Sequence, residues 1–215
     1  MEKVTTDRHR TFCMLYIVRH GQTDWNTKGI VQGHLDSPLT EEGVRQAKAI
    51  GERFEGVSFD AVFSSDLARA VKTAEFAVLE KKLAVRTSQA LRERRYGVFE
   101  GKHKDDFDAE SRKLLIQFEA LFKREKNGAF LDRYNVESDE EVAARVITLL
   151  REIAVAFGGK HVLVITHGGI LRVLLTHLGF MKHEELGFGK IGNAGHVVVK
   201  SDGVDFFLED IFGIA

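Results

Sequence analysis

Four short apolar runs, separated by segments with helical periodicity, restrict the fold of this chain more than any other feature of its sequence. The runs are residues 13–18, 61–63, 83–85 and 161–166. Each has the length of a single buried strand. Strands that alternate with helices predict an α/β fold, in which a mostly parallel sheet is covered by helices on both faces.

The segments between the runs carry helix start and stop signals. Predicted helices cover about residues 40–54, a stretch that begins at Ser65 or Asp66, residues 142–157 and residues 169–178. Thr40 can cap the first of these helices, and Gly179 can end the last. Near the end, Ser201-Asp202-Gly203 separates two apolar runs, which predicts an antiparallel C-terminal hairpin.

No internal repeat or Pro/Gly/Ser-rich linker marks a domain boundary, and Pro38 is the only proline. The sequence therefore predicts one domain over residues 1–215. Residues 92–140 fall between the third and fourth strands, and we expect them to form a small helical excursion above the sheet.

Composition excludes several classes of function. A net charge of −1 provides no long-range field for nucleic acid or an anionic membrane. The polar first ten residues do not resemble a signal peptide, and no apolar run is long enough to span a bilayer. One cysteine, Cys13, rules out an internal disulfide framework. A cytoplasmic protein without nucleic-acid or membrane partners is expected.

Reactive side chains follow the predicted strands. They are Arg19 and His20 after the first run, Arg69 after the second, Glu93 after the third, and His167 with Gly168 and Gly169 after the fourth. In open α/β sheets, ligands bind outside the carboxyl ends of the strands. Each side chain alone has an ordinary structural explanation, but their convergence at one edge favours an active site.

Two arginines, two histidines and a carboxylic acid suit phosphoryl transfer. Arginine binds phosphate oxygens bidentately, and a helix N-terminus that starts with glycines adds N–H donors. Neutral imidazole is a competent nucleophile toward phosphorus. Glu93 could protonate the departing alkoxide.

Motifs for other chemistries are absent. The sequence contains no GxxxxGK[ST], GxGxxG, HExxH or CxxC motif. The other histidines have no ligand spacing and are interpreted as ordinary polar positions: His9, His34, His103, His161, His177, His183 and His196. No metal site and no cofactor are therefore expected.

Five blocks of the chain resemble the histidine phosphatase superfamily, in its phosphoglycerate-mutase-like branch. They are RHGQTDWN at 19–26, QGHLDSPLTEEG at 32–43, SSDLARAVKTA at 64–74, LRERRYGVFEG at 91–101 and THGG at 166–169. The resemblance implies a three-layer α/β/α fold, with His20 as the phosphorylated nucleophile and Glu93 as the proton donor. It implies a phosphate and substrate pocket that includes His167, Arg19, Asn26, Gln32, Gly33, Arg69, Arg94, Tyr96, Lys104 and Gly168.

The choice of reaction within this family depends on weaker signals. QGHLDSPLTEEG and YGVFEG resemble the phosphatase members, and the excursion is shorter than the helical cap of the mutases. Arg94, Tyr96 and Lys104, however, match substrate-contacting residue types of mutases. Lys123-Arg124 matches their paired arginines or forms a solvated helix face.

We therefore expect a metal-independent phosphatase that hydrolyses small phosphorylated metabolites, with phosphoglycerate mutase as the alternative. A non-catalytic binding module is a third hypothesis, but such a protein would be expected to lack His20, His167 or Glu93. The sequence does not identify the physiological substrate, and it leaves a homodimer open.

Overall fold

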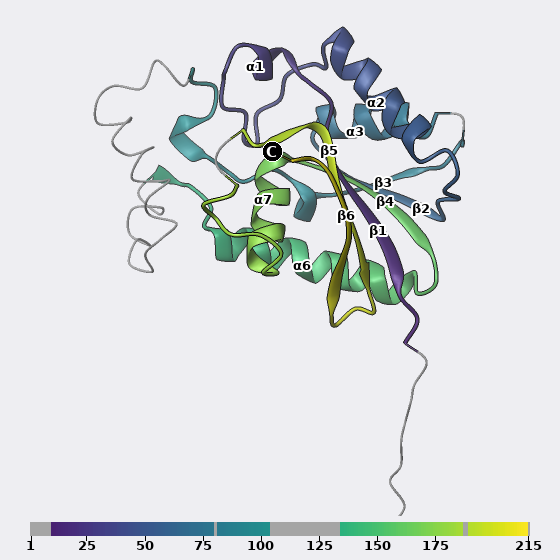
Figure 1. The fold of residues 1–215 in the computed structure, drawn as a ribbon. Coiled ribbons are helices and arrows are strands. Elements are labelled where there is room, and N and C mark those ends of the chain that lie inside the picture. Colours follow the sequence, from purple (N-terminus) through teal and green to yellow (C-terminus); the bar gives the residue numbers. More distant parts are fainter. Residues whose placement is uncertain (1–9, 80, 104–133, 187–188, 215) are drawn as a thin grey trace, which may run out of the picture.

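The computed structural model describes residues 10–79, 81–103, 134–186 and 189–214. These residues form a six-stranded sheet with the order β3-β2-β4-β1-β5-β6. The strands are β1 (Cys13–Arg19), β2 (Ala61–Ser65), β3 (Val85–Ser88), β4 (His161–Thr166), β5 (Ile191–Ser201) and β6 (Phe206–Ile214). The first four are parallel to one another, whereas β5 pairs antiparallel with β1 and with β6 (Figure 1).

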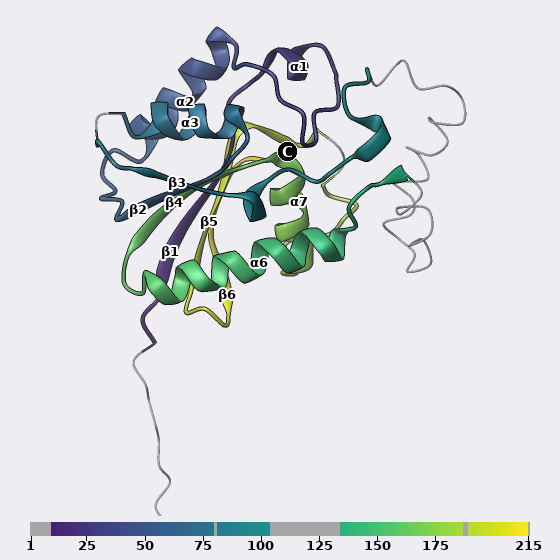
Figure 2. The ribbon, with the colours of Figure 1, turned by 180° about the vertical axis from the view of Figure 1, so that it is seen from behind.

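Helices cover both faces of the sheet. They are α1 (Asp24–Thr27), α2 (Glu41–Arg53), α3 (Ala68–Ala77), α6 (Asp139–Ala156) and α7 (Gly168–His177), with short 3₁₀ turns at Gln89–Leu91 and Gly97–Phe99. Figure 1 and the opposite view in Figure 2 show α2 and α3 on one face and α6 and α7 on the other. The predicted three-layer α/β/α arrangement is therefore confirmed.

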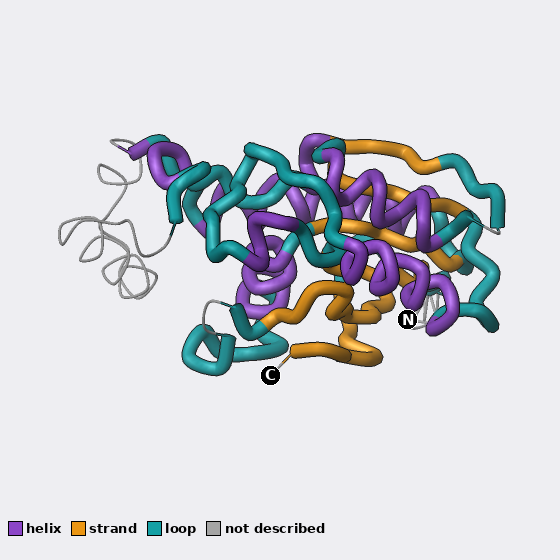
Figure 3. The backbone as a smooth tube through the Cα atoms, turned by 90° about the horizontal axis from the view of Figure 1, so that it is seen from above, coloured by secondary structure: helices purple, strands orange, loops and turns teal. Residues whose placement is uncertain are grey.

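Strand β1 lies in the middle of the sheet, between β4 and β5. Leu15 and Ile17 point into the core beneath α6 and α7, while Tyr16 and Val18 point into the core beneath α2 and α3. Burial on both faces explains why β1 is a continuous apolar run without alternation. At the far edge, β5 and β6 form the predicted hairpin, which carries the C-terminus in the view from above (Figure 3).

The predicted start of the second helix is wrong. Helix α3 begins at Ala68, and the residue before it, Leu67, makes no side-chain cap. Asp36 caps the helix from a distant loop, because its carboxylate accepts the backbone N–H groups of Ala68 and Arg69. Asp66, one of the two predicted caps, instead forms a two-pronged ion pair with Arg92, at 2.7 and 2.6 Å.

Two other predictions differ in extent. The third strand was expected at residues 83–85, but β3 covers Val85–Ser88, where it pairs with the end of β2. Of the expected excursion over residues 92–140, residues 104–133 lie outside the described part of the chain. Among the described residues, no helix has the length and apolar character needed to cross a membrane.

Candidate active site

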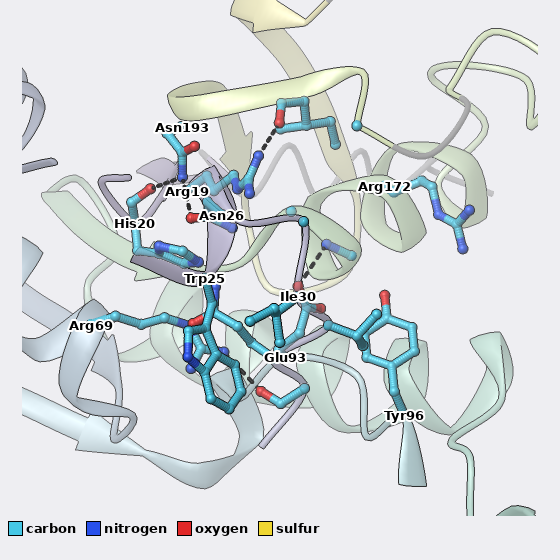
Figure 4. A pocket seen from close by; sticks show the side chains of 18 residues that line it. Arg19, His20, Trp25, Asn26, Ile30, Arg69, Glu93, Tyr96, Arg172 and Asn193 are labelled. Atoms are coloured by element: carbon cyan, nitrogen blue, oxygen red, sulfur yellow. Dashed lines mark hydrogen bonds between the residues drawn. The ribbon is translucent and has the colours of Figure 1, made fainter. Parts of the chain in front are cut away.

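A cavity of about 270 Å³ opens at the carboxyl ends of β1, β2 and β4. Figure 4 shows its side chains, which come from segments far apart in the chain. The lining residues are Arg19, His20, Trp25, Asn26, Gly29, Ile30, Val31, Gln32, Gly33, Arg69, Glu93, Tyr96, Gly168, Gly169, Arg172, Gly189, Ile191 and Asn193. The structure therefore brings most of the predicted site residues together.

His20 follows β1 directly and is held in one orientation. Its backbone N–H donates to the carbonyl of Thr166 at 2.9 Å, which ties it to the end of β4. Its Nδ1 lies 2.7 Å from the carbonyl oxygen of Gly21. Because a carbonyl only accepts, Nδ1 carries the proton and Nε2 keeps its lone pair. Nε2 bonds to no described residue, so a nucleophilic nitrogen remains available beside the cavity.

His167 lies next to His20, with their ring centroids 5.1 Å apart. It does not line the cavity, because it is fully buried behind the surface. Neither of its ring nitrogens has a hydrogen-bond partner among the described residues. A buried polar group without a partner is costly, so its presence points to a ligand that completes the site.

Both histidines are electrically neutral. Burial lowers the pKa of His20 well below the usual value, and the nearby Arg69 and Arg19 lower it further. The same burial and the positive charge of Arg69 hold the pKa of His167 well below its usual range. A neutral imidazole at physiological pH is the form that can attack phosphorus.

Arg19 and Arg69 bring two positive charges to the cavity. Arg69 is fixed by the loop after α1, where its guanidinium donates to the carbonyls of Gly33 and Leu35, both at 2.8 Å, and to Asp36 at 2.9 Å. Arg19 donates to the carbonyl of Ile191. The Nε atom of each arginine is buried without a partner among the described residues. These orphaned donors fit an anion bound between them.

Two glycines allow the loop that carries His20 to pack directly on helix α2. A Cβ atom on Gly21 would overlap the carbonyl oxygen of Gly43, and one on Gly43 would overlap the carbonyl oxygen of Gln22. Gly21 also donates its N–H to Thr73 of α3 at 3.0 Å. The backbone after β1 is therefore fixed between two helices, which keeps His20 rigidly placed.

Glu93 lies at the N-terminus of helix α7. Its carboxylate accepts the backbone N–H of Arg94 at 2.8 Å and that of Gly169 at 3.1 Å. A Cβ atom on Gly169 would overlap this carboxylate. Gly169 therefore allows the Glu93 carboxylate to approach closely. Its N–H, which the sequence predicted as a donor to a bound anion, donates instead to Glu93.

Tyr96 and Arg172 form the wall next to Glu93 (Figure 4). Burial and the neighbouring Glu93 raise the pKa of Tyr96 to about 12, so its hydroxyl stays protonated and can donate. Arg172 adds a third cation to the lining.

Asn26 and Gln32 line the cavity within a polar network. Asn26 accepts the backbone N–H of Thr23 at 3.1 Å and the side-chain amide of Asn193 at 3.2 Å. Gln32 donates to the Thr23 hydroxyl at 2.8 Å. Asn193 also donates to the carbonyl of His20 at 3.2 Å. This network fixes the wall opposite Glu93.

One predicted substrate contact, Arg94, does not line the cavity. Arg94 is fully buried outside the lining and forms an ion pair with Asp139 at the start of α6. Burial lowers its pKa to about 10. Lys104 lies outside the described residues, as do Lys123 and Arg124.

Two histidines interpreted as ordinary polar positions have specific surroundings. His34 Nε2 donates to the carbonyl of Glu93 at 2.9 Å. His196 is buried and stacks on Phe212 with ring centroids 5.4 Å apart. His196 is therefore a core residue, and His34 helps to hold the segment that carries Glu93.

Eight lining residues were not predicted from the sequence: Trp25, Gly29, Ile30, Val31, Arg172, Gly189, Ile191 and Asn193. Arg172 could have been found, because it follows Gly168 by four residues and therefore lies on the same side of α7. Asn193 carried no signal, since it precedes the apolar run of β5, and Ala194 beside it has a φ of 59°.

These features together fit an anion next to an imidazole that could act as a nucleophile. Neutral His20 lines the cavity with Arg19, Arg69 and Glu93 (Figure 4). His167, whose ring nitrogens have no partner among the described residues, lies buried beside His20. Within the described part of the chain, no three His, Cys, Asp or Glu side chains group in a way that could hold a metal ion.

This chain is similar to known phosphatases and phosphoglycerate mutases. A broad-specificity phosphatase of Saccharomyces cerevisiae is 32% identical over 177 residues, covering 79% of this chain and 72% of that protein. A 2,3-bisphosphoglycerate-dependent phosphoglycerate mutase of Haemophilus influenzae is 33% identical over 215 residues, covering 87% and 94%.

A solved mycobacterial glucosyl-3-phosphoglycerate phosphatase superposes with a TM-score of 0.73 at 28% identity, covering 94% of this chain and 99% of that structure. The sequence also matches the family described as the histidine phosphatase superfamily (branch 1) over residues 15–212. The chain therefore belongs to the histidine phosphatase superfamily.

Proposed function

We propose that this protein hydrolyses small phosphate monoesters through a phosphohistidine on His20. The observation that carries the proposal is the neutral His20, which shares one cavity with the unpartnered donors of Arg19 and Arg69 and lies next to the buried, unpartnered ring of His167. A phosphoryl group held by those donors would have its phosphorus next to the nucleophile.

In the first step, Nε2 of His20 attacks phosphorus, and the bond between phosphorus and the ester oxygen breaks. Glu93 gives a proton to the departing oxygen, so the product leaves as an alcohol. The charge that develops on the equatorial phosphoryl oxygens is stabilised by Arg19 and Arg69. His167 supports the same oxygens from its buried position.

In the second step, water attacks the phosphorus of phosphohistidine. The Glu93 carboxylate, left without its proton, accepts one from this water, and the P–N bond breaks with its electron pair returning to Nε2. Inorganic phosphate is released, and both residues return to their starting states.

We propose that the reaction requires no metal ion. Guanidinium groups and imidazole N–H donors would supply the positive charge that Mg²⁺ supplies in other phosphoryl-transfer enzymes. A cytoplasmic location is proposed as well, supported by the free thiol of Cys13, which is buried in the core.

The position of Arg94 outside the cavity favours hydrolysis over mutase activity. A mutase must hold a second anionic group of its substrate while the phosphoryl group is exchanged, which needs further cations. Arg94 forms an ion pair with Asp139 outside the cavity and is not among the cations that line it. Arg172 is the observation that favours the mutase alternative, because it adds a cation to the lining and mutases occur among the relatives.

Phosphate release and isomerisation should be followed on one preparation of the wild-type protein. We expect inorganic phosphate from several monoesters, without priming by 2,3-bisphosphoglycerate, and the same rates after prolonged chelation. Interconversion of 3- and 2-phosphoglycerate should be slower than phosphate release. Isomerisation that outruns phosphate release by about a hundredfold, roughly 2.7 kcal/mol in barrier height, would establish the mutase alternative instead.

Gly169→Ala tests the position of Glu93. The added methyl group overlaps the Glu93 carboxylate, so we expect kcat on an alkyl phosphate to fall by about tenfold to a hundredfold. Gly56→Ala is the matched control, because a Cβ atom there meets nothing within 4 Å. Steady-state kinetics on both variants gives the comparison, and equal rates in the two would contradict this role of Gly169.

A further inference from the structure

A partly buried ion pair between Arg145 and Glu137 holds the segment that carries Glu93. Arg145, on helix α6, donates to the carbonyls of Ala90 at 2.7 Å, Arg92 at 2.8 Å and Glu93 at 3.2 Å. The same guanidinium makes a two-pronged ion pair with Glu137, at 2.6 and 2.8 Å. One side chain therefore satisfies three backbone carbonyls of a single short segment.

This segment has little structure of its own. Residues 92–96 lie between two short 3₁₀ turns and belong to no helix or strand. Side chains replace the missing backbone bonds: Thr166 donates to the carbonyl of Leu91 at 2.9 Å, and His34 donates to that of Glu93. The carbonyls of residues 90–93 are thus all bound by side chains, three of them by Arg145.

Glu137 completes the clamp from the other side. It accepts the backbone N–H of Arg95 at 3.1 Å through its side chain, and its own N–H donates to the carbonyl of Arg95 at 2.9 Å. Burial acts to raise the pKa of Glu137, but the hydrogen bonds and charge of Arg145 lower it below the usual value. Glu137 therefore remains charged and keeps the guanidinium of Arg145 oriented.

We propose that Arg145, oriented by Glu137, is a positioning residue that sets the Glu93 carboxyl group at the correct distance from the leaving oxygen. Arg145 does not line the cavity, so it acts through the backbone of residues 90–93 and not on the substrate. Its planar fork is suited to this task, because it offers five N–H donors in fixed directions. The inference rests on the proposed role of Glu93 as proton donor.

The test compares Arg145→Met with the wild-type protein on two substrates, an alkyl phosphate and p-nitrophenyl phosphate. Because the aryl leaving group hardly needs a proton, only the alkyl reaction depends on the position of Glu93. We expect kcat on the alkyl phosphate to fall by about ten- to a hundredfold, and kcat on the aryl phosphate by no more than about threefold. A general loss of folded protein would lower both rates equally.

Two further variants keep the test decisive if Arg145→Met does not fold. Arg145→Lys retains the positive charge but loses the planar fork, so it should fold and still show the selective loss on the alkyl substrate. Arg151→Met is the matched control on the same helix, because Arg151 is exposed and, among the described residues, its side chain donates a hydrogen bond only to the carbonyl of Val204. It should leave both rates unchanged.

A double-mutant comparison with Glu93→Gln distinguishes a failure of the positioning role of Arg145 from a failure of the proposed role of Glu93 as proton donor. If Arg145 acts through Glu93, adding Arg145→Met to Glu93→Gln should change the alkyl rate by no more than about twofold. Equal losses on both substrates, or losses that multiply in the double variant, would overturn the role of Arg145 alone. No selective loss in Glu93→Gln itself, or no hydrolysis by the wild-type protein, would overturn the proposed function and this inference with it.

Discussion

His20→Ala is expected to lower kcat by about 10⁴-fold or more, because removal of a covalent nucleophile eliminates the two-step route altogether. The wild-type protein, quenched rapidly during turnover, should carry a phosphate on His20 that is stable in base and labile in acid. Mass spectrometry of peptides prepared at alkaline pH would locate it. His177→Ala is the control, because His177 is exposed at the end of α7.

The fold should survive the loss of His20. The backbone bonds from His20 to Thr166 and from Gly21 to Thr73 do not involve the imidazole. Wild-type turnover in His20→Ala, or a phosphate on another residue, would contradict the assignment.

The stability of this variant has its own pH dependence. Burial, Arg69 and Arg19 lower the pKa of His20 in the folded state, whereas an unfolded histidine titrates near about 6.5. Below that pH the unfolded chain binds a proton that the folded protein excludes, so the wild type loses stability as the pH falls. His20→Ala removes this contribution. Its melting temperature should therefore fall less than that of the wild type between neutral pH and mildly acidic pH.

The position of the site could be predicted because strand ends are a local property of the sequence. An apolar run that stops at Arg19 and His20, and another that stops at His167, already show where the side chains leave the sheet. Parallel strand order then brings these ends together without any knowledge of the packing. The fold class followed from the same alternation of strands and helices.

What the sequence did not reveal are contacts between segments distant in the chain. Asp36 caps helix α3 across 32 residues, and Arg145 reaches Glu93 across 52. Arg94 matched a substrate-contacting residue type, yet it forms an ion pair with Asp139 outside the cavity. None of these pairings has a periodicity or a spacing, because each depends on how complete elements pack against one another.

Glu93→Gln is expected to lower kcat on an alkyl phosphate by about 10²- to 10⁴-fold, the usual contribution of a general acid. An alkoxide is a poor leaving group, so its departure depends on the proton that Glu93 supplies. The nitrophenolate ion leaves without that proton, and kcat on p-nitrophenyl phosphate should therefore fall far less. Steady-state kinetics on both esters measures the ratio of the two losses, in which errors in enzyme concentration cancel.

The geometry around Glu93 defines how this ratio has to be interpreted. Both carboxylate oxygens accept backbone N–H groups, from Arg94 and from Gly169. In Glu93→Gln, the new NH₂ group meets one of those donors, so one hydrogen bond is lost and the side chain can shift. A shift that disturbs phosphate binding would slow both substrates together. A large loss on the alkyl ester with a small loss on the aryl ester would show that proton donation by Glu93 has failed, whereas equal losses would make Glu93 a residue that positions the substrate.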